Sequence, residues 1–80
     1  MITVFLWQAD GPRQGGRGVS GDQGSARRAA AGRLRSGAAT TAVVEEATAG
    51  IGIRTLADGY CPTGEAWRAR VADGRVTWMP

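Results

Sequence analysis

The first apolar run of the chain predicts a β-strand. Residues 2–8, Ile-Thr-Val-Phe-Leu-Trp-Gln, are rich in β-branched and aromatic residues, and a turn signal, Asp-Gly-Pro, follows at residues 10–12. Successive side chains of a strand point to opposite faces, so Phe5 and Trp7 share one face and three aliphatic residues share the other. Because both faces are apolar, we expect this strand inside a sheet or at a contact with a second protein chain.

A helix is predicted from a start signal at Ser20 to about Arg35. Ser20 and Gln23 have the spacing of a capping box, and Gly37 supplies the left-handed residue that commonly ends a helix. At the helical period of about 3.6 residues, one side of this helix is apolar but small. The expected buried residues are Ala26, Ala29, Ala30 and Leu34. With so small an apolar side, the helix should lie close to whatever it covers.

The segment between this strand and this helix, at about residues 10–21, predicts a flexible loop because it is rich in glycine. Within it, Gly16-Arg-Gly18-Val-Ser-Gly21 matches the G-x-G-x-x-G dinucleotide fingerprint. The fingerprint needs a tight turn from strand to helix, whereas these glycines begin well after the strand has ended. We therefore expect a solvated loop here and no nucleotide cofactor.

The clearest pattern lies at the C-terminus, where two alternating segments flank Asp73-Gly74. Residues 66–72 and 75–79 alternate in polarity, and Asp-Gly between them is typical of a two-residue type I′ turn. Such a turn sets the register and therefore the faces of both strands. The face expected to meet the helix carries Trp67, Ala69, Val71, Val76 and Trp78. The face expected to be basic carries Arg68, Arg70, Arg75 and Thr77.

Two further strands are expected in the middle of the chain. Residues 40–48 favour a strand through Thr-Thr-Ala-Val-Val, although the Glu-Glu-Ala that follows is compatible with a helix. Residues 51–56 favour another strand, and residues 57–64 a connection. The predicted fold class is α+β in the order β-α-β-β-β, with one helix packed on a mostly antiparallel sheet. Residues 1–80 form one small domain.

Composition restricts the chemistry of the protein. The chain has 80 residues and a net charge of +3, and its ten basic residues are all arginines. A bias toward alanine, glycine and arginine is typical of a GC-rich genome, such as an actinobacterial one, so the basic charge is weak evidence for a polyanionic partner. Histidine is absent and Cys61 is the single cysteine, which excludes the usual zinc ligands and histidine-activated nucleophiles. We expect no enzyme, no metal and no cofactor.

The basic face of the C-terminal hairpin is the candidate binding site. Arg68, Arg70 and Arg75 would form a stripe with Thr77, and Arg54 would lie alongside. A two-stranded ribbon can enter the major groove of DNA, where arginine reads guanine. The predicted function is a small nucleic-acid-binding or regulatory accessory protein. Arginines are also ordinary occupants of a solvent-facing sheet, so the same pattern is compatible with a face that has no ligand.

The apolar first strand supports an alternative from a different class, a protein–protein interaction module. Phe5 and Trp7 would then be an exposed interface, with a second copy of the chain or another protein as the partner. No membrane partner is expected, because the apolar start is too short to span a bilayer and lacks the flanks of a signal peptide. These features predict a cytoplasmic protein.

Overall fold

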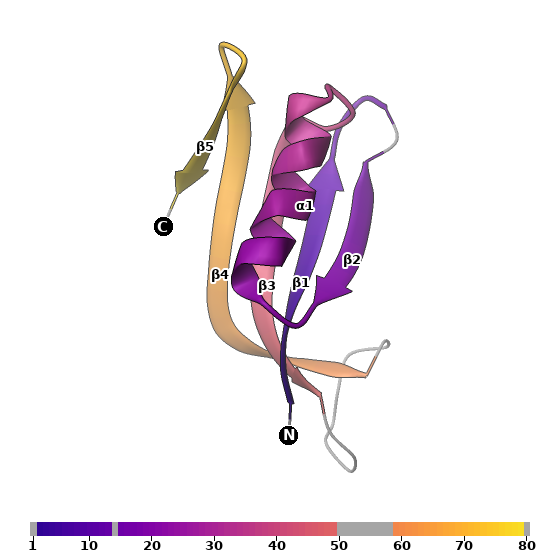
Figure 1. Ribbon diagram of the computed structural model, residues 1–80, viewed down its shortest axis with the longest axis vertical. Helices are drawn as coiled ribbons and strands as arrows, with labels where there is room; N and C mark the ends of the chain where they lie inside the picture. Colours follow the sequence, from indigo (N-terminus) through magenta and orange to yellow (C-terminus); the bar gives the residue numbers. More distant parts are fainter. Residues whose placement is uncertain (1, 14, 50–58, 80) are drawn as a thin grey trace.

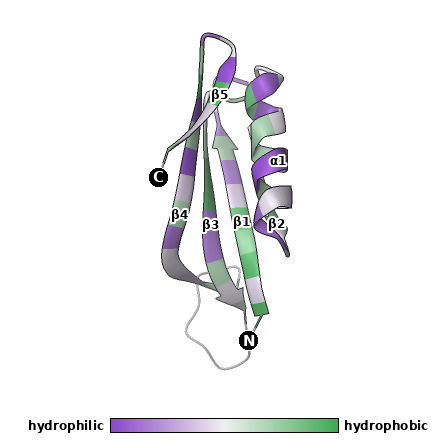
Figure 2. Ribbon diagram, turned by 60° about the vertical axis from the view of Figure 1, so that its left-hand side comes forward, coloured by the Kyte–Doolittle hydropathy of each residue, from purple (hydrophilic) through white to green (hydrophobic). Residues whose placement is uncertain are grey.

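The computed structural model describes residues 2–13, 15–49 and 59–79 and shows one helix packed on a five-stranded antiparallel sheet (Figure 1). The elements are β1 (Ile2–Asp10), β2 (Gly16–Ser20), α1 (Gln23–Arg35), β3 (Thr41–Ala49), β4 (Tyr60–Ala72) and β5 (Arg75–Met79). Across the sheet the strands follow the order β2-β1-β3-β4-β5. Figure 2 shows that α1 lies on one side of the sheet and that no other described element lies on the opposite side. The α+β class and the packing of one helix on an antiparallel sheet are confirmed.

The strand β2 corrects the prediction of a loop over the whole of residues 10–21. Gly16 to Ser20 pair with β1, with Leu6 opposite Val19 and Trp7 opposite Gly18. Glycine-rich sequence has little intrinsic preference for extended backbone, so pairing with the strong β1 strand decides this structure. The loop is thereby shortened to the turn between β1 and β2.

The middle of the chain is a strand, as its β-branched residues predicted. Residues 41–49 pair with β1 on one side and with β4 on the other, so the helical alternative is wrong. The connection predicted over residues 57–64 is also wrong from Tyr60 onward, because β4 begins at that residue. There, Pro62 pairs with Ala47 across an irregularity in the ladder, and Gly64 has a φ of 101°. The strand predicted over residues 51–56 lies outside the described residues.

The C-terminal hairpin forms in the predicted register. Asp73 and Gly74 have φ angles of 51° and 75°, the positive values that a type I′ turn requires. Val71 therefore lies opposite Val76, and Arg70 lies opposite Thr77. This register places the apolar and the arginine side chains of the hairpin on opposite faces, as predicted.

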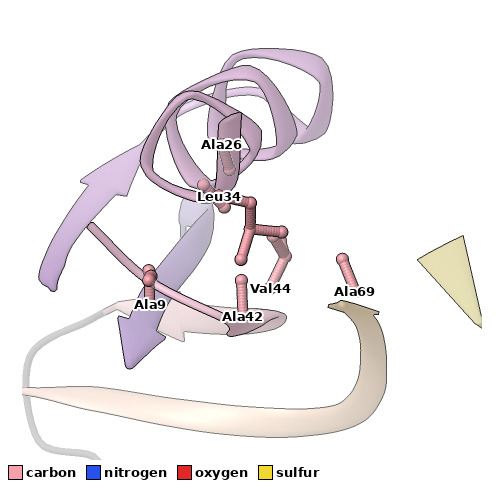
Figure 3. Close-up of a cluster of buried hydrophobic side chains, with 8 residues drawn as sticks. Ala9, Ala26, Leu34, Ala42, Val44 and Ala69 are labelled. Carbon is pink, nitrogen blue, oxygen red and sulfur yellow. The ribbon is translucent and has the colours of Figure 1, made fainter. Parts of the chain in front are cut away.

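The core between α1 and the sheet is built mainly from alanine. Figure 3 shows Leu34 of α1 and Val44 of β3 at the centre of this cluster, with alanines from the helix and the sheet around them. These two are the largest side chains that are fully buried in the described part of the chain. The buried alanines of the cluster are Ala9, Ala26, Ala30, Ala39, Ala42 and Ala69. Because alanine projects so little, the backbone of the helix can lie close to the strands.

The buried side of the helix differs from the prediction in one exchange of residues. Ala31 is buried, whereas Ala29 is only half-buried. The buried stripe is therefore centred between Ala30 and Leu34, about 50° further round the helix than the sequence suggested. With 13 residues in α1, the described part of the chain contains no helix long and apolar enough to cross a membrane.

Asp22 is the N-cap of α1, in place of the predicted Ser20. Its carboxylate accepts a hydrogen bond from the backbone N–H of Ser25 at 2.8 Å, and Arg28 lies 3.9 Å away. The hydrogen bonds from Ser25 are the main reason that the pKa of Asp22 lies below its ordinary value of 3.8. At the other end, Gly37 has a φ of 79° and its N–H donates to the carbonyl of Leu34, as predicted for a helix stop.

The Asp22 cap makes stability depend on pH. A carboxyl group whose pKa is lowered by folding stabilises the fold above its unfolded pKa, and this contribution disappears as pH falls through the folded value. We expect the thermal unfolding midpoint of the wild type to fall as pH decreases below about 4, and to fall less in Asp22→Asn, because asparagine caps a helix without titrating. Circular dichroism melts from neutral to acidic pH measure both curves. Parallel curves for the two proteins would contradict this role of Asp22.

The alanine core makes its few larger residues important for stability. We expect Leu34→Ala to lower the free energy of unfolding by about 2–5 kcal/mol, because it removes buried contacts and leaves a cavity. The matched control is Val19→Ala on the uncovered face of the sheet, where Val19 is 49% exposed and the loss should stay near 0.5 kcal/mol. Urea unfolding of both variants gives the comparison. Equal losses would show that the helix–sheet interface is not the main core.

Candidate functional site

The sheet has one face covered by α1 and one uncovered face, which we call the open face. On the covered face, Val44 of β3 lies opposite Trp7 of β1 and Trp67 of β4, and all three belong to the core or pack against it. The intervening residues of each strand point to the open face. No other described helix or strand covers the open face.

The open face of the β4–β5 hairpin carries the predicted arginines. Arg68, Arg70 and Arg75, which we call the arginine cluster, are all exposed. Thr77 is exposed and lies directly opposite Arg70, and Arg75 is opposite Ala72. Four of the five predicted nucleic-acid contacts thus come together on one surface. The fifth, Arg54, lies outside the described residues.

The arginine cluster has no ion pair or hydrogen bond with any other described side chain. The single salt bridge among the described residues joins Arg28 to Asp22 on the opposite layer. Acidic residues of the open face lie on other strands: Asp10 is on β1 and Glu45 on β3. Asp73, in the hairpin turn, is the acidic residue next to the cluster along the chain. The cluster therefore presents positive charge that no described partner neutralises.

A fourth arginine joins the open face from the other edge of the sheet. Arg17 of β2 is exposed and lies opposite Gln8 of β1. Sequence reasoning missed this residue because it assigned residues 10–21 to a loop, in which a side chain has no defined face. The alternation Gly16-Arg17-Gly18-Val19 was the signal that could have revealed it, since small and large side chains alternate along this segment.

Phe5 and Trp7 do not form the exposed interface that was expected. Both lie on the covered face and pack against the core, and the ring centroids of Phe5 and Trp67 are 6.2 Å apart. β1 is also an inner strand, paired with β2 and β3 over most of its length, so its edge cannot pair with a second copy along that part. The sequence shows that both faces of this strand are apolar, but only the position of α1 decides which one is covered.

Arg27 of α1 contacts two tryptophan rings on the covered face. Its guanidinium carbon lies 5.0 Å from the ring centroid of Trp78 and 5.6 Å from that of Trp67. Cation–π contacts of this length are favourable, and the guanidinium lies over both rings. Arg27 is therefore occupied by these aromatic rings, and it differs in this way from the arginines of the open face.

The glycines of the G-x-G-x-x-G match have a packing role. A Cβ atom at Gly18 would lie 2.6 Å from the indole nitrogen of Trp7, and one at Gly16 would lie 3.3 Å from the same ring and 3.1 Å from the Arg33 side chain. Both glycines lie in β2, where the fingerprint would need a turn into the helix. They make room for Trp7 beneath α1, which explains their spacing of two without any phosphate.

The site of Gly18 gives a direct test of this packing role. We expect Gly18→Ala to lower the free energy of unfolding by about 1–3 kcal/mol, because the Trp7 ring must move to admit the methyl group. Gly32→Ala is the control: a Cβ atom there meets nothing within 4 Å. Alanine should raise helix stability at Gly32 by about 0.5–1 kcal/mol. Chemical denaturation measures both changes. An unchanged free energy of unfolding in Gly18→Ala would contradict the packing role.

Glu46 and Cys61 are further residues with reactive side chains on β3 and β4. Oε1 of Glu46 accepts a hydrogen bond from the hydroxyl of Thr63 at 3.0 Å, which links β3 to β4. Cys61 is a half-buried free cysteine of β4. No group of three or more potential metal ligands occurs among the described residues.

The open face also contains a shallow hollow of about 390 Å³ next to the arginine cluster. Leu6, Val19 and Val43 form its apolar floor. Arg17, Gln8 and Glu45 supply its polar groups. The hollow is on the strands β2, β1 and β3, and Val43 of its floor lies opposite Arg68 of the cluster.

Comparison of the chain with protein-family models, with curated proteins and with solved structures gives no match.

Proposed function

We propose that this protein binds nucleic acid through the open face of its β4–β5 hairpin. The observation that supports this most directly is the arginine cluster: Arg68, Arg70 and Arg75 project from one uncovered surface without a described acidic partner. Unpaired arginines on a flat face provide the charge that phosphate groups recognise. Thr77, opposite Arg70, adds a hydroxyl group that can contact a phosphate or sugar.

The spacing of the cluster suits an extended polyanion. Side chains two residues apart on a strand, such as Arg68 and Arg70, are separated by about 6.6–6.8 Å, and neighbouring strands by about 4.8 Å. The cluster therefore spreads over two adjacent strands at the edge of the sheet. A two-stranded antiparallel ribbon of this kind can enter the major groove of a duplex, where arginine donates two hydrogen bonds to guanine.

The other described arginines make weaker candidates for this role. Arg27 lies over two tryptophan rings, and Arg28 is paired with the helix cap Asp22. Arg33 and Arg35 lie in the last turn of α1, where positive charge favours the helix dipole and so has a structural explanation. The arginine cluster has no comparable partner in the described part of the fold.

Charge reversal on the open face tests this proposal. We expect Arg68→Glu/Arg70→Glu to abolish binding to a fluorescein-labelled duplex of random sequence, measured by anisotropy at low salt. Three arginine–phosphate contacts in the wild type predict a slope of log K against log salt of roughly −2.7, since each contact contributes about −0.9. Circular dichroism of the variant is the check that it remains folded.

The matched control reverses two exposed arginines on the other layer, Arg28 and Arg35, and changes the net charge by the same amount. We expect Arg28→Glu/Arg35→Glu to retain most of the affinity. If both double variants lose binding equally, net charge alone is responsible. If only the helix variant loses binding, the interface is on α1, and either result contradicts the proposal.

A further inference from the structure

Two arginines lie in the cross-strand row that crosses the hollow: Arg17 lines the hollow, and Arg68 lies one strand beyond Val43. Arg17 of β2 is opposite Gln8, Gln8 is opposite Val43, and Val43 is opposite Arg68 of β4. Three strand intervals separate the two arginines, which places their backbones about 14 Å apart. A group held over Gln8 and Val43 therefore has a guanidinium within reach on either side.

The neighbouring row supplies the rest of the hollow. There, Val19 lies opposite Leu6, and Leu6 lies opposite Glu45. Val19 is 49% exposed, while Leu6 and Glu45 are half-buried. The result is an apolar floor with one carboxylate at its border. Such a floor suits a flat and weakly polar group, and the carboxylate selects for a hydrogen-bond donor on the edge of that group.

An unpaired nucleobase combines these properties with the right charge around it. Its face is apolar enough to lie on aliphatic side chains, and its own phosphates extend outward, toward Arg17 and Arg68. Guanidinium planes also stack on unpaired bases. The exocyclic amino group of cytosine donates to a carboxylate, whereas the carbonyl oxygen at the same ring position of uracil is repelled by it.

We infer that the hollow holds one unpaired base of a single-stranded nucleic acid and that Glu45 selects a base with an exocyclic amino group. This inference rests on the proposed function, because the arginine cluster must first hold the phosphate chain. It goes further by naming the ligand class, a single strand with amino-bearing bases, and the residue that distinguishes between bases.

Oligodeoxycytidine and oligodeoxyuridine of about eight nucleotides form a matched pair of probes, because their bases differ only at the amino or carbonyl position and the adjacent ring nitrogen. We expect the wild type to bind the cytidine strand about fivefold or more tightly at neutral pH. Glu45→Gln should bring this ratio close to one. The control Glu65→Gln removes the same charge from an exposed position in β4 and should leave the ratio unchanged.

Methyl NMR spectra supply a direct readout of the hollow. Ring currents of a bound base should shift the methyl signals of Leu6, Val19 and Val43 on addition of the cytidine strand. Equal binding of the two strands, unshifted methyl signals, or a ratio that Glu45→Gln leaves unchanged would overturn the inference while leaving the arginine cluster as a nucleic-acid site. Absence of salt-sensitive binding to any strand or duplex would overturn the proposed function as well.

Discussion

Helix α1 lies close to the sheet because alanine faces alanine across their interface. Ala26 and Ala30 of the helix meet Ala9, Ala42 and Ala69 of the strands, and Leu34 and Val44 are the only large side chains fully buried among the described residues. A core of small side chains buries little apolar area per residue, so its stability depends on close approach more than on volume. The large aromatic residues are accommodated at the border, where Trp7 covers Gly18 and Arg27 covers Trp67 and Trp78.

The packing of one helix on the sheet also explains why the sheet has an open face. One helix can cover only one face of a five-stranded sheet, and α1 covers the side on which β1, β3 and β4 carry their core residues. The charged residues of the other face remain in water, where arginine is readily accommodated. A fold with one helix therefore produces a broad uncovered sheet surface as a consequence of its architecture, and the proposed nucleic-acid site uses that surface.

Local features of the sequence were sufficient to predict some elements. The hairpin register followed from Asp73-Gly74, because a two-residue turn leaves one possible pairing, and the end of α1 followed from Gly37. The strand β2 could not be predicted in the same way. Its glycines have low strand propensity, and it is held in place by β1 and by the need to make room for Trp7. Arg17 and the hollow beside it were missed for the same reason.

The sequence by itself determined which side chains share a face within each predicted strand, because alternation along an extended backbone is a property of the chain alone. The same alternation, with the Asp73-Gly74 turn, also groups Arg68, Arg70, Arg75 and Thr77 on one face. Only the tertiary structure decided which face α1 covers, and therefore that Phe5 and Trp7 pack against the core. It also decided the order β2-β1-β3-β4-β5, which places Arg17 at the hollow and Arg68 opposite Val43, a residue that lines it. Strand order and coverage arise from contacts between segments far apart in the chain, which local pattern does not specify.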